Sequence, residues 1–273
     1  MSETTKPDLS GVPATSLITL YIRATESQRP DALLKDERAE EVVRQLDQET
    51  LRKTLPLTED STRAVAMVKT REFDRFTQDY LACHPDAVVA HIGCGLDTRF
   101  ERVVKDNGQV EWYDLDLPEV IELRRKILGG EGAQHHFLAC SVFDIAWLQE
   151  VGAHRPRPFL ILAEGVFMYF EEAQVKSLVL TLKEHLRGAQ LVFDAYSPFL
   201  MWSHNARVAR KRIGAPLHWA LKHPRDLEGW SDGIRLLDER YPFQSPEPRI
   251  RGSLKLRLVP SLSKGIGVFH YQL

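Results

Sequence analysis

The sequence of 273 residues contains few cysteines, no long apolar run and no strong excess of either charge. Its three cysteines, Cys83, Cys94 and Cys140, are too few for a disulfide framework and lack the spacing of a metal site. We therefore expect free thiols in a reducing compartment and no bound metal. The net charge of −2 does not favour nucleic acid or an acidic membrane surface as a partner.

Membrane insertion and secretion are not indicated either. The longest apolar run, "FLILAEGVFMYF", is too short to span a bilayer and contains Glu164. The N-terminal segment "MSETTKPDLSGVPATS" lacks the basic and apolar regions of a signal peptide. We expect a cytoplasmic protein with no membrane or nucleic-acid partner, and the sequence leaves its oligomeric state open.

Helical periodicity dominates the first part of the chain. Residues 1–13 are polar and contain two prolines and a glycine, which predicts a flexible tail. Apolar residues then recur at intervals of three and four, as in amphipathic helices. We expect residues 14–84 to form a helical cap and residues 85–273 to form the cofactor-binding domain. The predicted helices of the cap are residues 15–27, 36–55 and 61–85.

The second region alternates strands with helices. This order predicts a doubly wound, mostly parallel α/β sheet. Residues 197–245 break the alternation with tryptophans, histidines and prolines, and we predict a substrate lid there. Residues 246–262 are compatible with helix or strand, and the last segment is expected to be an edge strand. The predicted strands are residues 86–93, 109–116, 135–140, 157–165, 189–196 and 265–273.

A glycine-rich turn follows the first predicted strand, in the segment "VVAHIGCGLDTRF". Gly93 and Gly95 allow a ligand to approach the backbone closely. A dinucleotide-binding turn would have a third glycine at the position of Thr98. Asp97, the expected N-cap of the next helix, would also place a carboxylate where a pyrophosphate binds. The turn therefore favours a cofactor that is cationic there and has no phosphate, such as S-adenosylmethionine.

Two further acids end predicted strands. Asp116 ends the second strand, 23 residues after Gly93, where a carboxylate can accept hydrogen bonds from ribose hydroxyls. Nicotinamide cofactors also carry ribose, so Asp116 does not separate the two cofactors. Glu164 ends an apolar strand, where an unpaired carboxylate would cost several kcal/mol. We therefore expect Glu164 to face a partner or a ligand.

Six segments together carry a family resemblance. They run in order between about Thr19 and Phe170, and the likeness fades after Tyr196. The segments are "RATESQRPDALLKDERA", "TREFDRF", "HIGCGLDTRF", "WYDLDLPEVIELRR", "SVFDIAW" and "AEGVFMYF". The chain resembles the leucine carboxyl methyltransferase family, especially its bacterial branch similar to the tetracenomycin polyketide O-methyltransferase. The resemblance implies a class I methyltransferase with a seven-stranded Rossmann-like sheet, which converts S-adenosylmethionine to S-adenosylhomocysteine without a metal.

The resemblance also implies roles for single residues. Arg71 of "TREF" looks like the arginine that holds the methionine carboxylate, and Gly93 like the glycine under the methionine part. Asp116 looks like the ribose acid, and Ser141 and Val142 like the pair beside the adenine. Ser141 departs from the eukaryotic members, which have aspartate there. The complete set of expected cofactor-binding residues is Arg71, Gly93, Cys94, Gly95, Asp97, Asp116, Leu117, Ser141, Val142 and Glu164.

The family resemblance implies O-methylation of a small metabolite, and the tryptophans of the lid favour a flat aromatic or polyketide acceptor of secondary metabolism. A carboxylate acceptor is ionised at neutral pH and needs no base, whereas a hydroxyl acceptor is helped by one. The sequence leaves both open, and its candidates for a catalytic group are His204, Tyr169 and Tyr196. The alternatives are a non-catalytic, cofactor-binding sensor or scaffold and, as a third class, a nicotinamide-dependent oxidoreductase.

Overall fold

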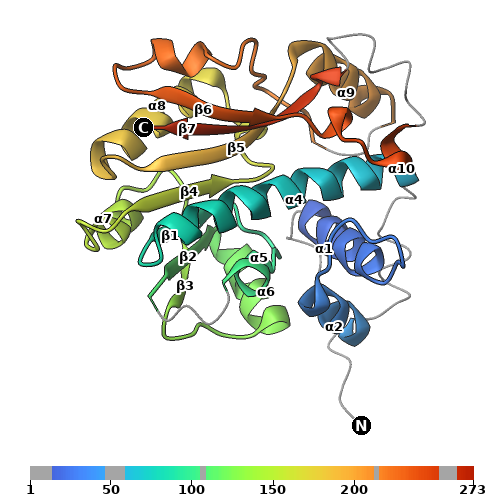
Figure 1. The fold of residues 1–273 in the computed structure, drawn as a ribbon, viewed down its shortest axis with the longest axis horizontal. Helices are drawn as coiled ribbons and strands as arrows, with labels where there is room; N and C mark the ends of the chain where they lie inside the picture. Colours follow the sequence, from blue (N-terminus) through green and yellow to red (C-terminus); the bar gives the residue numbers. More distant parts are fainter. Residues whose placement is uncertain (1–13, 47–58, 105–108, 212–214, 252–262) are drawn as a thin grey trace.

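A seven-stranded sheet runs through the centre of the molecule (Figure 1). The computed structural model describes residues 14–46, 59–104, 109–211, 215–251 and 263–273. Within these residues the strand order is β3-β2-β1-β4-β5-β7-β6. The strands are β1 (Val88–Ile92), β2 (Glu111–Asp116), β3 (His135–Ala139), β4 (Phe159–Ala163), β5 (Gln190–Tyr196), β6 (Arg235–Arg240) and β7 (Ile266–Gln272).

The strands from β1 to β5 pair in parallel, and β7 is antiparallel to both of its neighbours. The expected doubly wound, mostly parallel sheet is therefore confirmed. Chain order reverses at β1, which lies between β2 and β4. In sheets of this kind ligands bind beyond the carboxyl ends of the strands at such a reversal.

One expectation for the C-terminal strands is wrong, and one strand is missed. The last segment is expected at an edge, but β7 pairs with β5 on one side and β6 on the other. The edge strand is β6, which lies within residues 197–245 and is not predicted from the sequence. Its segment, "RLLDER", contains only half-buried and exposed residues. An edge strand of this kind has no apolar run by which it could be recognised.

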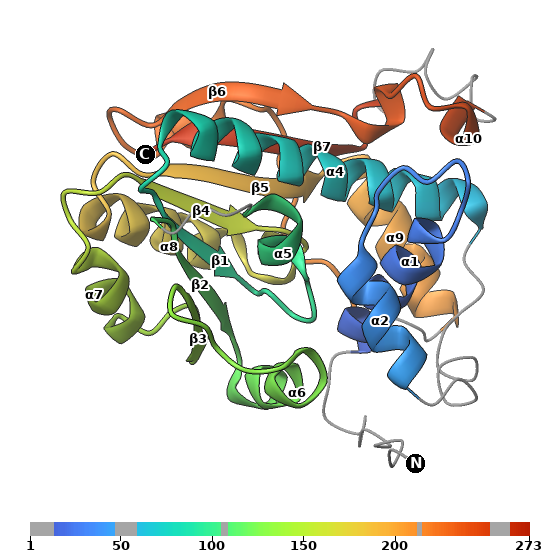
Figure 2. The same ribbon diagram turned by 60° about the horizontal axis from the view of Figure 1, so that its bottom comes forward.

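Helices cover both faces of the sheet, because alternate side chains of its strands point to opposite sides. On one face, apolar residues of β1 pack in the same cluster as α7 (Ala146–Gly152) and α8 (Glu172–His185). On the other face they pack with α4 (Asp60–Cys83) and α5 (Arg99–Val103). Figures 1 and 2 show the long helix α4 crossing this second face and extending past the sheet.

The N-terminal helices pack at the end of α4 that extends past the sheet. α1 (Ala14–Ser27) and α2 (Glu37–Gln45) share an apolar cluster with α6 (Pro118–Leu128). α1 also packs against the first turns of α4. The second helix expected in the cap ends at Gln45, and residues 47–58 lie outside the described part. The predicted tail, residues 1–13, lies outside it as well.

The C-terminal part adds short helices around α9 (Pro198–Lys211), which follows β5. The undecided stretch 246–262 begins as a helix, and its residues 252–262 lie outside the described part. No helix that the structure describes is long and apolar enough to cross a membrane. The remaining elements are η1 (Phe167–Tyr169), η2 (Asp226–Gly229), η3 (Pro242–Gln244) and α10 (Pro248–Arg251).

A buried ion pair ties α10 to the N-terminal helices. The Nη1 and Nη2 atoms of Arg249 donate to the two carboxylate oxygens of Glu26 at 2.6 and 2.8 Å. Nη2 also donates to Asp60, at the start of α4, at 3.0 Å. Such a bidentate pair fixes orientation as well as distance. The end of the chain that follows β6 is therefore anchored to α1 and α4.

Candidate active site

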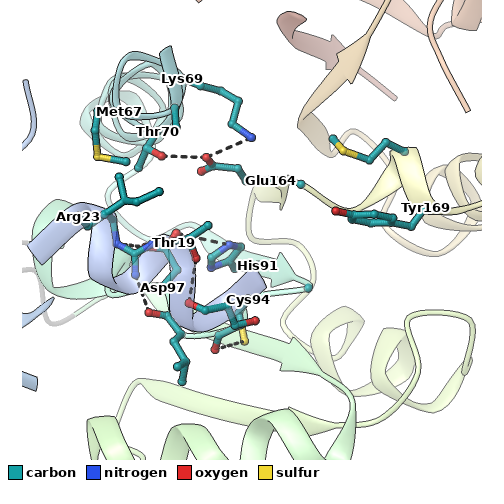
Figure 3. Close-up of a pocket in the computed structure, with 18 of the residues that line it drawn as sticks. Thr19, Arg23, Met67, Lys69, Thr70, His91, Cys94, Asp97, Glu164 and Tyr169 are labelled. Atoms are coloured by element: carbon teal, nitrogen blue, oxygen red, sulfur yellow. Dashed lines mark hydrogen bonds and ion pairs between the residues drawn. The ribbon is translucent and has the colours of Figure 1, made fainter. Parts of the chain in front are cut away.

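A cavity of about 260 Å³ lies at the carboxyl ends of β1, β4 and β5 (Figure 3). The turn after β1 forms one side, and α1 and α4 form another. This is the position expected for a ligand site in a doubly wound sheet. Residues that line the cavity include Arg23, Lys69, Thr70, Gly93, Cys94, Gly95, Asp97, Glu164, Tyr169 and Tyr196.

The turn after β1 requires glycine at two positions. Gly93 and Gly95 have φ angles of 65° and 52°, which side chains rarely tolerate. A Cβ atom on Gly93 would lie 2.3 Å from Cγ2 of Val166, and one on Gly95 would lie 3.0 Å from Oγ of Ser16. Glycine therefore allows neighbouring segments to approach the turn and leaves its backbone accessible from the cavity.

Asp116 and Arg124 hold this turn from β2 and α6. The carboxylate of Asp116 accepts hydrogen bonds from the backbone N–H groups of Gly95 and Leu117, both at 2.8 Å. Nη1 of Arg124 donates to the carbonyl oxygens of Asp97 at 2.6 Å and Gly95 at 3.2 Å. Burial raises the pKa of Asp116, although the two amides oppose this effect. The turn is thus fixed by protein groups alone.

Glu164 follows β4 directly and has three partners within the protein, of which Figure 3 shows Lys69 and Thr70. Its Oε1 accepts a hydrogen bond from Thr70 at 2.9 Å and lies 3.6 Å from Nζ of Lys69. Its Oε2 accepts from Nη2 of Arg99 at 2.5 Å. Burial alone would raise the pKa of Glu164, but Lys69 and Arg99 lower it below its ordinary value. The carboxylate is therefore ionised and paired.

Asp97 is also paired, and the expectation that it caps a helix is wrong. α5 begins at Arg99 with Thr98 at its N-cap position. The carboxylate of Asp97 instead lies 2.9 Å from Arg99 and 3.0 Å from Arg102. Burial would raise the pKa of Asp97, but these arginines hold it well below its usual range. Because the protein supplies the compensating charge, this acid alone is no argument for a cationic cofactor.

Two arginines join these acids into one buried network. Arg99 is 0% exposed, and besides the two contacts above its Nε donates to Asp74 at 2.7 Å. Arg102 donates from Nε to the other oxygen of Asp74 and from Nη1 to Asp36, both at 2.8 Å. The network thereby joins α4, α5, the residue that caps α2 and the segment after β4.

Sequence reasoning identified Asp97 and Glu164 but missed the other members of this network. Asp36, Asp74 and Arg99 lie in the segments "KDERA", "TREFDRF" and "GLDTRF" that carry the family resemblance. One signal was available, because Asp74 stands beside Phe73 on a helix whose apolar face is buried. A charged residue on such a face needs a partner. The pattern does not say which residue that partner is.

Arg71 does not line the cavity. It lies in a separate hollow beside β6, and its buried Nε makes no hydrogen bond with the described residues. The cations that line the cavity are Lys69, two positions earlier on α4, and Arg23 on α1. Lys69 donates to Asp194 at 2.8 Å. The geometry gives the role predicted for Arg71 no support.

Arg23 uses only part of its guanidinium within the protein. Nε donates to Asp36 at 2.9 Å, and Nη2 donates to the carbonyl oxygen of Leu96 at 2.6 Å. Its third nitrogen, Nη1, has no hydrogen bond to any residue that the structure describes. Since Arg23 lines the cavity, this nitrogen is a donor left for a ligand.

The residues expected beside the adenine lie farther along the same edge of the sheet. Ser141 and Val142 follow β3, and the preceding Cys140 donates its N–H to the carbonyl oxygen of Asp116 at 3.0 Å. Leu117 is 44% exposed. None of Leu117, Ser141 and Val142 lines the cavity, and neither does Asp116, which contacts the glycine turn through the N–H of Gly95.

A second cavity, of about 290 Å³, adjoins the first, and Ala66, Lys69 and Tyr196 line both. Tyr169 lines only the first cavity and His204 only the second. Burial raises the pKa of Tyr169 and of Tyr196, so both hydroxyls are neutral at ordinary pH. The three residues considered as catalytic groups are therefore divided between two connected sites.

Comparison with known proteins gives one family and several relatives. The model of the leucine carboxyl methyltransferase family matches residues 16–183. The tetracenomycin polyketide synthesis O-methyltransferase TcmP of Streptomyces glaucescens is 34% identical over 90% of this chain and 88% of its own length. The S-adenosyl-L-methionine-dependent methyltransferase dpfgK of Gibberella zeae is 28% identical over 86% of this chain and 84% of its own.

Solved structures share the fold at low sequence identity. A SAM-dependent methyltransferase from Anabaena variabilis aligns with a TM-score of 0.52 at 11% identity, over 100% of this chain and 98% of that one. A DUF574 family protein from Streptomyces avermitilis aligns with a TM-score of 0.55 at 13% identity, over 94% of this chain and 96% of that one. At these identities the likeness concerns the fold alone.

The network predicts a stability defect that depends on pH when Arg99 is removed. We expect Arg99→Met to lower the free energy of unfolding by about 3–5 kcal/mol at about pH 8, because buried carboxylates lose their cation. In the unaltered protein, the lowered pKa values of Asp97 and Glu164 contribute stability that is lost only as the pH falls below about 4. In the variant, burial raises these pKa values, so the folded state takes up protons and gains stability as the pH falls.

The difference in the free energy of unfolding between the unaltered protein and Arg99→Met should therefore become smaller from about pH 8 to about pH 5, as measured by urea unfolding at each pH. Arg75→Met is the matched control, because Arg75 lies on α4 and is 57% exposed in its pair with Glu72. A surface pair of this kind contributes about 0–1 kcal/mol. A gap for Arg99→Met that stayed constant with pH would contradict the network.

Proposed function

This chain belongs to the leucine carboxyl methyltransferase family and is an S-adenosylmethionine-dependent methyltransferase, and we propose that it methylates a carboxylate oxygen of a small aromatic or polyketide-like acceptor. The observation that carries the proposal is the cavity in which the glycine turn, Glu164 and the cations Arg23 and Lys69 face one another. The 34% identity to a polyketide O-methyltransferase supports oxygen as the methylated atom.

The charges around the cavity fit S-adenosylmethionine, whose ammonium, sulfonium and carboxylate sum to one positive charge. Within the described residues, the buried network carries one more carboxylate than cations. Its cations are Arg23, Lys69, Arg99 and Arg102, and its carboxylates are Asp36, Asp74, Asp97, Glu164 and Asp194. A cationic ligand beside this network would therefore bring its total charge closer to neutrality, which favours such a ligand over a nicotinamide dinucleotide with its pyrophosphate.

Single residues have chemistry that suits the parts of this cofactor. Nη1 of Arg23 is the donor that remains for the methionine carboxylate, and Lys69 lines the same cavity from α4. Gly93, Cys94 and Gly95 offer a floor with little side-chain bulk. The thiol of Cys94 is neutral, because burial raises its pKa well above its ordinary value.

The rest of the cofactor would extend along the edge of the sheet. Asp116 would hold the ribose hydroxyls with the lone pairs that its contacts with the backbone amides of Gly95 and Leu117 leave free. Leu117, Ser141 and Val142 would contact the adenine. When bound, S-adenosylmethionine supplies a methyl group already activated by the sulfonium, so the protein has mainly to position the acceptor and exclude water.

The boundary between the two cavities favours an acceptor that is already ionised. The polar groups there are the ammonium of Lys69 and the hydroxyl of Tyr196, and both are donors. Burial opposes the charge of Lys69, but Asp194 and Glu164 raise its pKa above the ordinary value, so it holds its proton. No uncompensated base among the described residues lies at this boundary, whereas a hydroxyl acceptor would be helped by one. A carboxylate acceptor is already ionised and needs no base at this boundary.

His204 is placed less favourably for a direct role. It lines only the second cavity, and its Nε2 lies 3.1 Å from the carbonyl oxygen of Ala215. Its ring centroid is 6.2 Å from that of Tyr196. A histidine in this position can contact the body of an acceptor more readily than the oxygen that is methylated.

Cofactor binding is the first test. Calorimetric titration should give micromolar binding of S-adenosylhomocysteine and none of NADH. Asp116→Asn should weaken that binding by about 1–3 kcal/mol, because the ribose hydroxyls lose an ionised acceptor. Arg71→Ala should leave it unchanged, because Arg71 lies outside the cavity.

Loss of affinity in Arg71→Ala with normal unfolding stability would restore the role that the family resemblance implies. Binding of NADH in place of S-adenosylhomocysteine would reject the methyltransferase function. Binding of S-adenosylhomocysteine without methyl transfer to any acid or phenol would support the sensor or scaffold alternative.

Two glycines separate backbone strain from a direct effect on the cofactor. Gly93 and Gly188 have φ angles of 65° and 78°, but only Gly93 lines the cavity. Gly188→Ala should lower the free energy of unfolding by about 1–2 kcal/mol through its left-handed backbone, and Gly93→Ala should lower it by more because of an added clash. Only Gly93→Ala should weaken S-adenosylhomocysteine binding, by about fivefold or more, because its Cβ would collide with Val166 and shift the turn. Equal affinities of the two variants for S-adenosylhomocysteine would show that the glycine turn does not contribute to the binding site.

The acceptor type predicts a pH profile. We expect kcat/KM for an aryl carboxylic acid to be flat above about pH 6, and to exceed that of the phenol with the same ring by about a hundredfold. His204→Ala should leave the profile flat. Release of S-adenosylhomocysteine measures the rate. A faster phenol reaction that rises with pH and is lost in His204→Ala would instead indicate a hydroxyl acceptor with His204 as its base.

A further inference from the structure

The second cavity carries a charge asymmetry that the methylated carboxylate does not explain. Three basic side chains line it, Lys69, His204 and Arg207, and no carboxylate does so within the described residues. Its other lining residues are apolar or carry hydroxyl groups. An uncompensated positive lining favours an anionic ligand.

The compensation differs between the inner and the outer part of this cavity. Lys69, at the boundary with the cofactor cavity, is already paired with Asp194 at 2.8 Å and lies 3.6 Å from Glu164. Arg207 has no ion pair with a described residue. Asp60, which begins α4 beside the outer lining residues, is engaged by Arg249 and does not line the cavity. Among the described residues, the positive charge that no carboxylate compensates is therefore that of Arg207, whose side chain is exposed.

Two helices set the length of the cavity. Along α4 the lining residues run from Lys69 back to Ser61, and along α9 they run from Leu200 to Arg207. Seven residues of α-helix span about 10 Å. The wall between the ends is apolar and includes Val65. Figures 1 and 2 both show α9 beside the end of α4 that extends past the sheet.

We propose that the acceptor carries a second acidic group, separated from the methylated carboxylate by an apolar body, and that Arg207 binds this second group. The inference rests on the proposed function, because the inner carboxylate defines where the acceptor begins. A carboxylate, a sulfonate and a phosphate share the required chemistry, since each forms paired hydrogen bonds with a guanidinium. Arg207 is thus a specificity-determining residue that discriminates between acceptors with one and with two acids.

The test uses matched acids with the same rigid body. Biphenyl carboxylic acid has one acidic group, and biphenyl dicarboxylic acid has a second at its far end. Binding of each is measured by calorimetry to the full-length protein saturated with S-adenosylhomocysteine, and methyl transfer is measured separately with S-adenosylmethionine. We expect the diacid to bind at least about tenfold more tightly than the monoacid, as a charge-assisted contact predicts.

Variants of α9 assign this preference to one residue. Arg207→Ala should abolish the preference for the diacid and leave monoacid affinity unchanged, and Arg207→Lys should retain part of it. Arg210→Ala is the matched control, because Arg210 is an exposed arginine on the same helix that does not line the cavity. It should behave as the unaltered protein.

Failure of the inference and failure of the proposed function give different results. If S-adenosylhomocysteine does not bind to the folded protein, the proposed function fails and the inference fails with it. If it binds and the diacid shows no advantage, including the case in which neither acid binds, only the inference is overturned. A preference for the diacid that survives in Arg207→Ala would also overturn it.

Discussion

The buried guanidinium of Arg99 is the charge on which the site depends. It meets three carboxylates that come from α4, from the turn after β1 and from the segment after β4. A buried carboxylate without a cation is costly, and a buried guanidinium without carboxylates is equally so. These segments therefore depend on one another for their positions, because burial of each carboxylate and burial of Arg99 are tolerable only when they are paired.

This network leaves the ligand only what the protein has not used. Glu164 and Asp97 point toward the cavity, yet their charges are already met by Arg99 and its neighbours. The N–H groups of the glycine turn are also engaged, by Leu115 and Asp116. Among the described residues, the groups that remain include one nitrogen of Arg23 and the lone pairs of Asp116 that its two amide partners leave free. A site of this kind is preorganised, since its charged groups need little rearrangement when a ligand arrives. The ligand preference of the cavity is therefore inferred from its unused donors and acceptors, and not from the number of charged residues that line it.

The sequence predicts much of the fold, because buried parallel strands leave apolar runs that end at ligand-binding positions. It therefore correctly locates Gly93, Asp116 and Glu164 at the carboxyl ends of the strands. It does not predict β6, whose exposed segment leaves no such run. It also does not separate Lys69 from Arg71. The two are about 200° apart around an α-helix, so a shift of two positions moves a side chain to the opposite face. Pairing partners such as Asp74 and Arg102 depend on tertiary contacts that no local pattern contains.

The two cavities differ in how much of their walls falls within the residues that the family model matches. The first cavity is lined by α1, α4, the turns after β1 and β4, and Tyr196. Of these lining residues, all except Tyr196 fall within residues 16–183, which the family model matches. The second cavity shares α4 but takes its other wall from α9 and from Phe243, Ile250 and Ile266, which lie outside the matched range. α4 is a single helix of 24 residues and lines both cavities. With the proposed assignment of the first cavity to the cofactor and the second to the acceptor, substitutions in α9 would alter the acceptor cavity while α4 keeps the cofactor cavity in place.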